Sequence, residues 1–148
     1  MKRLYLLGLL CLLSFAAQAH KPSDSYLNFI VEGNAIDGQW DIALRDLDFA
    51  LGLDANGDAA ITWGEVKAKQ LDIDAYAMAR LNLQSDGQSC PATVTDHLVD
   101  DHTDGAYAVL RFKAQCPQPI KQLQTRYGLF FDIDPQHKGL LQLQYEDV

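Results

Sequence analysis

The stretch SYLNFIVEGNAIDGQWDIAL (residues 25–44) decides the fold, because apolar and polar residues alternate along both of its halves. Alternation with a period of two is typical of a half-buried β-strand. Gly33 and Asn34 separate the halves, and this residue pair favours a tight turn. The sequence therefore predicts a β-hairpin whose buried face carries Leu27, Phe29, Val31, Ile36, Trp40, Ile42 and Leu44.

After Leu44 the hydrophobic pattern changes to the spacing of a helix. A first helix is predicted to begin at Arg45, and a second to run from Trp63 to about Arg80. A polar segment rich in Asp, Asn and Gly separates them. The expected apolar positions are Leu47, Phe49, Ala50 and Leu53 in the first part, and Val66, Ile73, Tyr76 and Ala77 in the second.

Strand patterns return beyond the second helix, at residues 81–83, 93–99, 106–112, 122–133 and 140–145. The strand at 122–133 is expected to place Tyr127, Leu129, Phe131 and Ile133 on one face. With the hairpin, these segments make about seven short strands. The predicted fold class is α+β: an antiparallel β-sandwich or open barrel with one inserted helix-loop-helix.

The first nineteen residues have the three parts of a secretory signal peptide. Lys2 and Arg3 form a basic start, Leu4 to Phe15 an apolar run, and Ala17-Gln18-Ala19 a small-residue cleavage site. We expect cleavage after Ala19, which leaves 20–148 as a single exported β-rich domain, periplasmic or secreted. The apolar run is too short for a membrane span, and no later stretch is long enough, so the mature chain is expected to have none.

The composition is acidic, with 20 Asp and Glu residues against 12 Lys and Arg residues. Removal of the signal peptide would take away two of the basic residues and none of the acidic ones. Because such a surface repels phosphate groups, nucleic acid is excluded as an expected partner.

Two of the three cysteines lie outside the signal peptide. Cys11 falls in the apolar run, whereas Cys90 and Cys116 belong to the expected mature domain. An oxidising compartment favours a disulfide between Cys90 and Cys116, and the alternative is two free buried thiols.

Residues 54–65, DANGDAAITWGE, have the spacing of the twelve-residue EF-hand calcium loop. Calcium prefers six to eight oxygen ligands, and a tight turn followed by a helix can converge such ligands on one ion. The predicted ligands are the side chains of Asp54, Asn56, Asp58, Thr62 and Glu65 and the backbone carbonyl of Ala60. The segment 45–80 is therefore predicted to be EF-hand-like and to bind one Ca²⁺.

Ala59 departs from the pattern, because glycine is expected at this sixth position of the loop. The chain must bend there through a left-handed conformation that costs a residue with a β-carbon roughly 1–2 kcal/mol. We therefore expect a weak calcium site. The alternative is an Asx-rich turn and helix cap that binds no ion.

The sequence contains other candidate functional residues, for which the pattern is weaker. His20 would become the mature N-terminus, where its imidazole and the free α-amine could together chelate copper or nickel. His97 and His102 are expected to lie in a solvated strand and loop. A solvated face is likewise the simplest interpretation of seven aspartates: Asp24, Asp37, Asp41, Asp46, Asp48, Asp72 and Asp74.

Four segments carry a resemblance to a known family: HKPSDSY (20–26), QWDIALRDLD (39–48), ITWGE (61–65) and FFDIDPQH (130–137). They resemble the exported N-terminal region of HupE/UreJ-like bacterial membrane proteins. The resemblance implies a multi-span membrane domain associated with nickel or cobalt handling, which the sequence to Val148 does not contain. It therefore also implies a membrane-protein partner or a membrane domain missing from this sequence.

No arrangement of residues typical of nucleophilic catalysis is present in the sequence. The predicted function is thus a non-catalytic, calcium-binding domain with a structural or partner-binding role. The alternative is a periplasmic accessory domain for nickel, cobalt or copper handling that uses His20.

Overall fold

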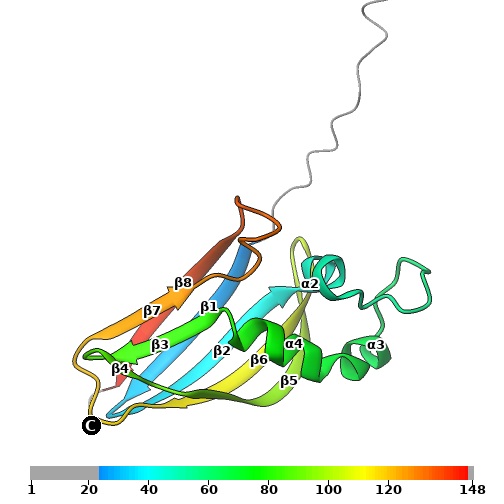
Figure 1. The fold of residues 1–148 in the computed structure, drawn as a ribbon. Helices are drawn as coiled ribbons and strands as arrows, with labels where there is room; N and C mark the ends of the chain where they lie inside the picture. Colours follow the sequence, from blue (N-terminus) through cyan, green and yellow to red (C-terminus); the bar gives the residue numbers. More distant parts are fainter. Residues whose placement is uncertain (1–23, 147–148) are drawn as a thin grey trace, which may run out of the picture.

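A computed structural model describes residues 24–146, which fold into eight strands and three helices (Figure 1). The predicted signal peptide and His20 lie outside the described residues. In chain order the elements are β1 (Asp24–Glu32), β2 (Ala35–Ala43), α2 (Leu44–Leu51), α3 (Trp63–Ala68), α4 (Gln70–Met78), β3 (Leu81–Ser85), β4 (Gln88–Ser89), β5 (Ala92–His102), β6 (Gly105–Gln115), β7 (Leu123–Tyr127) and β8 (Lys138–Glu146).

The strands form two sheets. A five-stranded sheet has the order β5-β6-β2-β1-β8, and a three-stranded sheet has the order β4-β3-β7. The predicted hairpin is confirmed: β1 and β2 are antiparallel, and Glu32 pairs with Ala35 across the turn. The α+β class is confirmed too. The prediction of a wholly antiparallel fold is wrong, because β8 pairs with β1 in parallel, with residue 24 beside residue 138.

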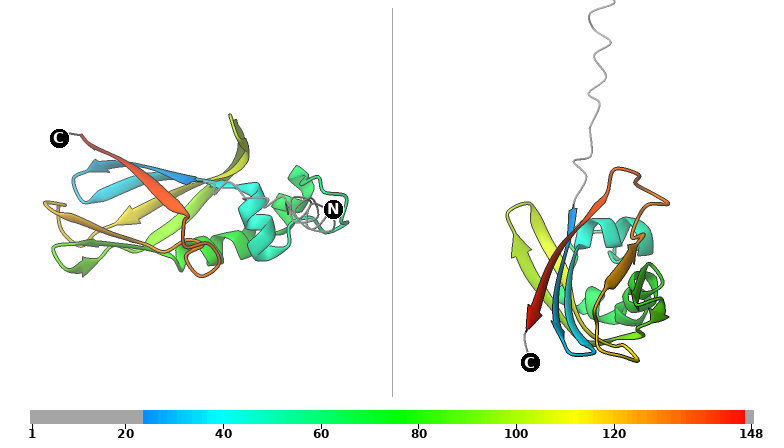
Figure 2. Two further views of the ribbon diagram at one scale, coloured as in Figure 1. Left: turned by 90° about the horizontal axis from the view of Figure 1, so that it is seen from above. Right: turned by 90° about the vertical axis from the view of Figure 1, so that its left-hand side faces the viewer.

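The three-stranded sheet and the helices lie on the same face of the five-stranded sheet (Figure 2). The core between these layers contains the predicted apolar face of the hairpin, including Leu27, Phe29 and Trp40. Gly38 leaves room for the ring of Phe112, its partner on the neighbouring strand β6, because a β-carbon there would lie 2.1 Å from that ring. One hydrophobic core therefore joins both sheets and the helices.

The helical region differs in detail from the prediction. The expected single helix from Trp63 to Arg80 is interrupted at Lys69, whose N–H points to the carbonyls of both Glu65 and Val66. Val66, Ile73 and Ala77 are buried as expected. Phe49, predicted on the apolar side of the first helix, is instead 77% exposed.

The predicted strand at 122–133 is only half correct, because β7 ends at Tyr127. Phe130 adopts a positive φ of 59°. Its carbonyl accepts hydrogen bonds from the N–H groups of Ile133 and Asp134, at 2.9 and 2.7 Å. The consecutive residues Leu129 and Phe130 are both buried, whereas Phe131 is half exposed. The alternation of apolar residues thus extends beyond the end of β7 into a turn. Tertiary packing, and not strand pairing, holds this turn in place.

The predicted disulfide is present. Cys90 and Cys116 are bonded, are 26 residues apart in the sequence and are both buried. The bond ties the segment after β4 to the end of β6 and so links the two sheets. Within residues 24–146, no helix combines the length and apolar composition that a membrane crossing requires.

Candidate metal centre

The predicted metal-binding loop lies between α2 and α3 and extends from the body of the domain (Figure 1). Gly52 ends α2 in a left-handed conformation, with φ of 64°. Leu53 is fully buried before the loop, and Ile61 packs against the core after it. The two ends of the loop are thus anchored by apolar contacts, while its polar middle is exposed.

The loop backbone curls around the carboxylate of Asp54. Oδ1 of Asp54 accepts hydrogen bonds from the N–H groups of Gly57 at 2.7 Å and Asp58 at 3.2 Å, and Oδ2 accepts one from Ala59 at 2.8 Å. The N–H of Asp54 itself donates to Oδ1 of Asp48 at 2.8 Å, which ties the loop to α2. A single carboxylate therefore organises the first half of the loop.

Ala59 has φ of 64°, which is the left-handed conformation expected at this position of the loop. A β-carbon makes this conformation unfavourable by roughly 1–2 kcal/mol. The hydrogen bonds from three backbone N–H groups to Asp54 favour the left-handed conformation of Ala59. So does the hydrogen bond from the Ala60 N–H to Asp58 Oδ1, at 2.9 Å. The strain predicted from the sequence is therefore located at Ala59.

Asn56 and Asp58 are joined to each other. The Asp58 N–H donates to Oδ1 of Asn56 at 2.9 Å, and Nδ2 of Asn56 donates to Oδ2 of Asp58 at 3.0 Å. These contacts are typical of side chains that shape a turn by bonding to nearby backbone.

Glu65 connects the start of α3 to the start of the loop. Thr62 caps the helix, since its Oγ1 accepts from the Glu65 N–H while Oε2 of Glu65 accepts from the Thr62 N–H at 2.9 Å and from the Thr62 hydroxyl at 2.8 Å. Oε1 of Glu65 accepts from the Ala55 N–H at 3.1 Å. The backbone and hydroxyl hydrogen bonds from Thr62 lower the pKa of Glu65. The acidic group is thus held ionised beside Asp54.

The six predicted ligand residues therefore share one exposed loop. In the part of the chain that the structure describes, no group of three or more His, Cys, Asp or Glu side chains is gathered tightly enough to hold a metal ion. The carboxylate oxygens instead accept N–H groups, as in the alternative of an Asx-rich turn with a capped helix. A carboxylate oxygen that accepts one hydrogen bond still has a lone pair for a second contact.

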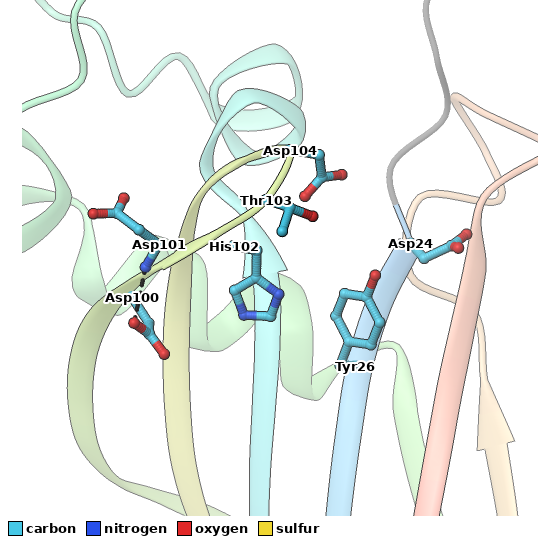
Figure 3. Close-up of a pocket in the computed structure, with 7 residues that line it drawn as sticks. All are labelled: Asp24, Tyr26, Asp100, Asp101, His102, Thr103 and Asp104. Carbon is cyan, nitrogen blue, oxygen red and sulfur yellow. Dashed lines mark hydrogen bonds between the residues drawn. The ribbon is translucent and has the colours of Figure 1, made fainter.

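A second cluster of polar side chains, which the sequence analysis did not predict, lies at the end of the five-stranded sheet. A pocket there is lined by Asp24, Tyr26, Asp100, Asp101, His102, Thr103 and Asp104 (Figure 3). The ring of His102 stacks on those of Tyr107 and Tyr26, with centroids 4.0 and 5.2 Å apart. Its Nε2 is hydrogen-bonded to Oδ2 of Asp41 at 3.1 Å.

These contacts correct the expectation of simple solvation for His97, His102, Asp41 and Asp74, whereas Asp37 and Asp72 are exposed as expected. Asp41 is buried beside His102, and His97 Nε2 lies 2.7 Å from Oδ1 of Asp74, joining β5 to α4. Each pair comes from elements distant in the sequence. No local signal could have paired them, because the first contact depends on the register of β2 and β5 with β6 and the second on the packing of α4 beside β5.

Asp46, in the first turn of α2, lies close to the same end of the sheet. Burial raises the pKa of its carboxyl to about 6; Arg45 opposes this increase, and the carboxylates of Asp134 and Asp104 add to it. Ionisation of Asp46 therefore costs free energy in the folded protein. The protonated carboxyl of Asp46 therefore stabilises the folded protein relative to the ionised one. This stabilisation is fully present below pH 3.8, the pKa of the group in the unfolded chain, and is lost as the pH rises through about 6.

We expect Asp46→Asn to stabilise the protein at pH 7.5 and to have little effect at pH 4. The shift corresponds to at most about 3 kcal/mol, and the 27% exposure of the side chain reduces this value. Urea denaturation at a series of pH values measures the effect. Asp72→Asn, which changes a more exposed aspartate of α4, serves as the control. A stabilisation by Asp46→Asn that is the same at every pH would contradict the assignment.

No family model matches the chain, and no curated protein or solved structure shows significant similarity to it. The described residues define a disulfide-bonded, β-rich α+β domain with an exposed acidic loop. The transition-metal site at His20 and the resemblance to HupE/UreJ-like proteins stay predictions.

Proposed function

We propose that this protein is a non-catalytic, calcium-binding domain, periplasmic or secreted, in which residues 54–65 hold one Ca²⁺. The observation that carries the proposal is the arrangement around Asp54: the backbone turns about its carboxylate through Ala59, and Glu65 reaches back to the Ala55 N–H. The acidic side chains of Asp54 and Glu65, from opposite ends of the loop, thus lie where these two ends meet.

The donors of the loop suit calcium. Its ligands would be the side-chain oxygens of Asp54, Asn56, Asp58, Thr62 and Glu65 and the carbonyl of Ala60. All are oxygens, and hard cations such as calcium prefer oxygen ligands. When bound, the ion would supply positive charge that offsets the mutual repulsion of three carboxylates. The loop contains neither His nor Cys, whose nitrogen and sulfur atoms zinc and copper favour.

The role of the ion would be to hold the helices against the sheets. Leu53 and Ile61 anchor the loop ends, and Ile61 lines a groove with Leu44 and Val66 from α2 and α3 and Ala106 from β6. An ion that stiffens residues 54–65 would therefore stabilise the position of α2 and α3. Binding to the folded state alone raises its stability by mass action, by about 2.7 kcal/mol at one hundred times the dissociation constant.

Addition of calcium in the millimolar range is expected to raise the melting temperature of the protein. Calorimetric titration should give one site with an affinity in the weak range of extracellular calcium modules, about 0.1–1 mM. Asp54→Ala and Glu65→Gln should abolish both the heat of binding and the thermal shift, because each removes a ligand charge. The same concentration of magnesium should give a smaller shift, since Mg²⁺ demands tighter octahedral geometry.

Two variants serve as controls. Asp37→Asn removes an exposed carboxylate of β2 that pairs with Lys113, and it should leave calcium binding unchanged. Ala59→Gly should retain binding or strengthen it, because glycine adopts positive φ without steric cost. A wild-type protein whose melting temperature and titration heat do not respond to calcium would contradict the proposal. It would favour the alternative of an Asx-rich turn that binds no ion.

A further inference from the structure

The two edges of the five-stranded sheet differ in how they are protected. β5, at one edge, carries Asp96, Asp100 and Asp101 and has an irregularity between Val94 and Asp96. Charges and bulges are the devices by which proteins keep edge strands from pairing with other chains. β8, at the opposite edge, pairs with β1 in unbroken register from Lys138 to Glu146. Its interior, GLLQLQY (139–145), contains no charge and no proline.

The outer edge of β8 is open in the part of the chain that the structure describes, because no strand of residues 24–146 pairs with it. Four large apolar side chains of this strand are 41% to 49% exposed: Leu140, Leu141, Leu143 and Tyr145. The register with β1 places Leu141, Leu143 and Tyr145 beside Leu27, Phe29 and Val31, on the face that is buried in the core. The core face thus continues onto β8, where Leu141, Leu143 and Tyr145 are only partly covered.

The sequence of β8 is complementary to itself when it is reversed. If two copies pair antiparallel about a two-fold axis at Gln142, Lys138 of each copy lies opposite Glu146 of the other. On the same outer face, Gln142 lies opposite Gln142, and Leu140 lies opposite Gln144. On the inner face, Leu141 lies opposite Leu143, and Gly139 lies opposite Tyr145.

This register pairs the opposite end charges and places Leu141 opposite Leu143 on the inner face. Residues directly opposite in an antiparallel pair share a face and are close enough to interact. A register shifted by two residues in either direction leaves both Lys138 and Glu146 without an opposite charge. A shift by one residue places inner side chains opposite outer ones, which one continuous sheet cannot accommodate.

We propose that β8 is a self-association edge, at which a second copy of this chain adds its own β8 in antiparallel orientation. The two five-stranded sheets then form one continuous sheet across a two-fold axis, in the isologous manner of most homodimers. The inner leucine and tyrosine side chains of the two copies cover one another, and the ion pairs close both ends. This inference is independent of the proposed calcium site.

Exchange of the end charges tests the pairing. Protein produced from the full sequence should show a monomer–dimer equilibrium in sedimentation and light scattering. Lys138→Glu alone and Glu146→Lys alone should each weaken the dimer, because two copies of either variant place like charges together at both ends. An equimolar mixture of the two variants should restore dimers, since one variant has two acidic ends and the other two basic ends. A folding defect in either variant would not be repaired by mixing.

Cysteine cross-linking tests the register. The two Gln142 residues are directly opposite, with Cα atoms about 4.5–5.5 Å apart in such a pair, which suits a disulfide. Gln142→Cys should therefore form a covalent dimer on mild oxidation. Gln144→Cys, the matched control on the same face, should not, because its copies would lie roughly 13 Å apart along the strands. The native pair Cys90 and Cys116 is already bonded.

Three results would overturn the proposal. The first is a wild-type protein that stays monomeric at every soluble concentration. The second is a dimer that Lys138→Glu and Glu146→Lys leave unchanged while Leu98→Lys, on the opposite edge strand β5, dissociates it. The third is equal cross-linking through Gln142→Cys and Gln144→Cys, which would exclude this register.

Discussion

Removal of the Cys90–Cys116 disulfide is expected to lower the free energy of unfolding by about 3.5 kcal/mol. The bond closes a loop between residues 26 apart, and the loss of this constraint gives the unfolded chain more conformational entropy. The double variant Cys90→Ala with Cys116→Ala removes the bond with little change in buried apolar character. Urea denaturation at neutral pH, with and without the substitutions, measures the difference.

Reduction of the wild-type protein is the control for the substitutions themselves. Because it breaks the same bond without altering the sequence, it should cause a loss of stability similar to that of the double variant. The hydrogen bonds beside the disulfide, from Cys116 N–H to Asn34 O at 2.8 Å and from Ile120 N–H to Gly33 O at 2.9 Å, hold this segment against the hairpin turn. Equal stability of the oxidised and reduced proteins would contradict a structural role for the bond.

Trp40→Ala is expected to destabilise the protein by about 3–5 kcal/mol, which is the usual cost of truncating a large buried aromatic residue. The ring of Trp40 is fully buried, and its centroid lies 5.7 Å from that of Tyr127 on the opposite sheet. Its Nε1–H donates to Oγ of Ser25 at 3.1 Å. The substitution therefore leaves a cavity between the sheets and removes a buried hydrogen bond.

Two further variants separate these effects. Trp40→Phe keeps most of the apolar contact, and Ser25 Oγ retains the hydroxyl of Tyr127 at 2.7 Å, so a smaller loss is expected. Trp63→Phe changes the other tryptophan, which is 47% exposed, and should have little effect on urea denaturation. If Trp63→Phe costs as much stability as Trp40→Ala, Trp40 is not the anchor between the sheets.

The parts of the fold that could be predicted are those governed by local patterns. Alternation along residues 25–44 specifies both strands and the buried face of the hairpin, and Gly33 with Asn34 specifies the turn. The disulfide could be predicted because, outside the predicted signal peptide, Cys90 and Cys116 have only one possible pairing. In each case the deciding information lies in neighbouring residues or in a simple count.

The parts that could not be predicted depend on contacts between distant segments. The parallel pairing of β8 with β1 leaves no trace in the composition of either strand. The turn after Tyr127 follows the alternation of a strand, and only its packing beside Arg80, whose carbonyl accepts the Gly128 N–H at 2.9 Å, shows where the strand ends. The contact of His102 with Asp41 likewise needs the register of three strands.

The candidate site falls between these cases. Its six predicted ligands lie within twelve consecutive residues, so their closeness and the left-handed bend at Ala59 follow from spacing alone. Whether the oxygens bind an ion or only the loop's own N–H groups is decided by a small difference between two sets of contacts. Spacing cannot supply that difference, and calcium titration measures it directly.

The pairing of β1 with β8 also governs the order in which the domain can form. β1 is the first described strand and β8 the last, so β1 has a partner on only one side until the ribosome has made residues 138–146. Contacts between such distant segments slow folding, because a long loop must close before they form. Helices and the β5–β6 hairpin can form early from neighbouring residues. The five-stranded sheet can be completed only after residues 138–146 have been made, and until then one edge of β1 has no strand partner among the described residues.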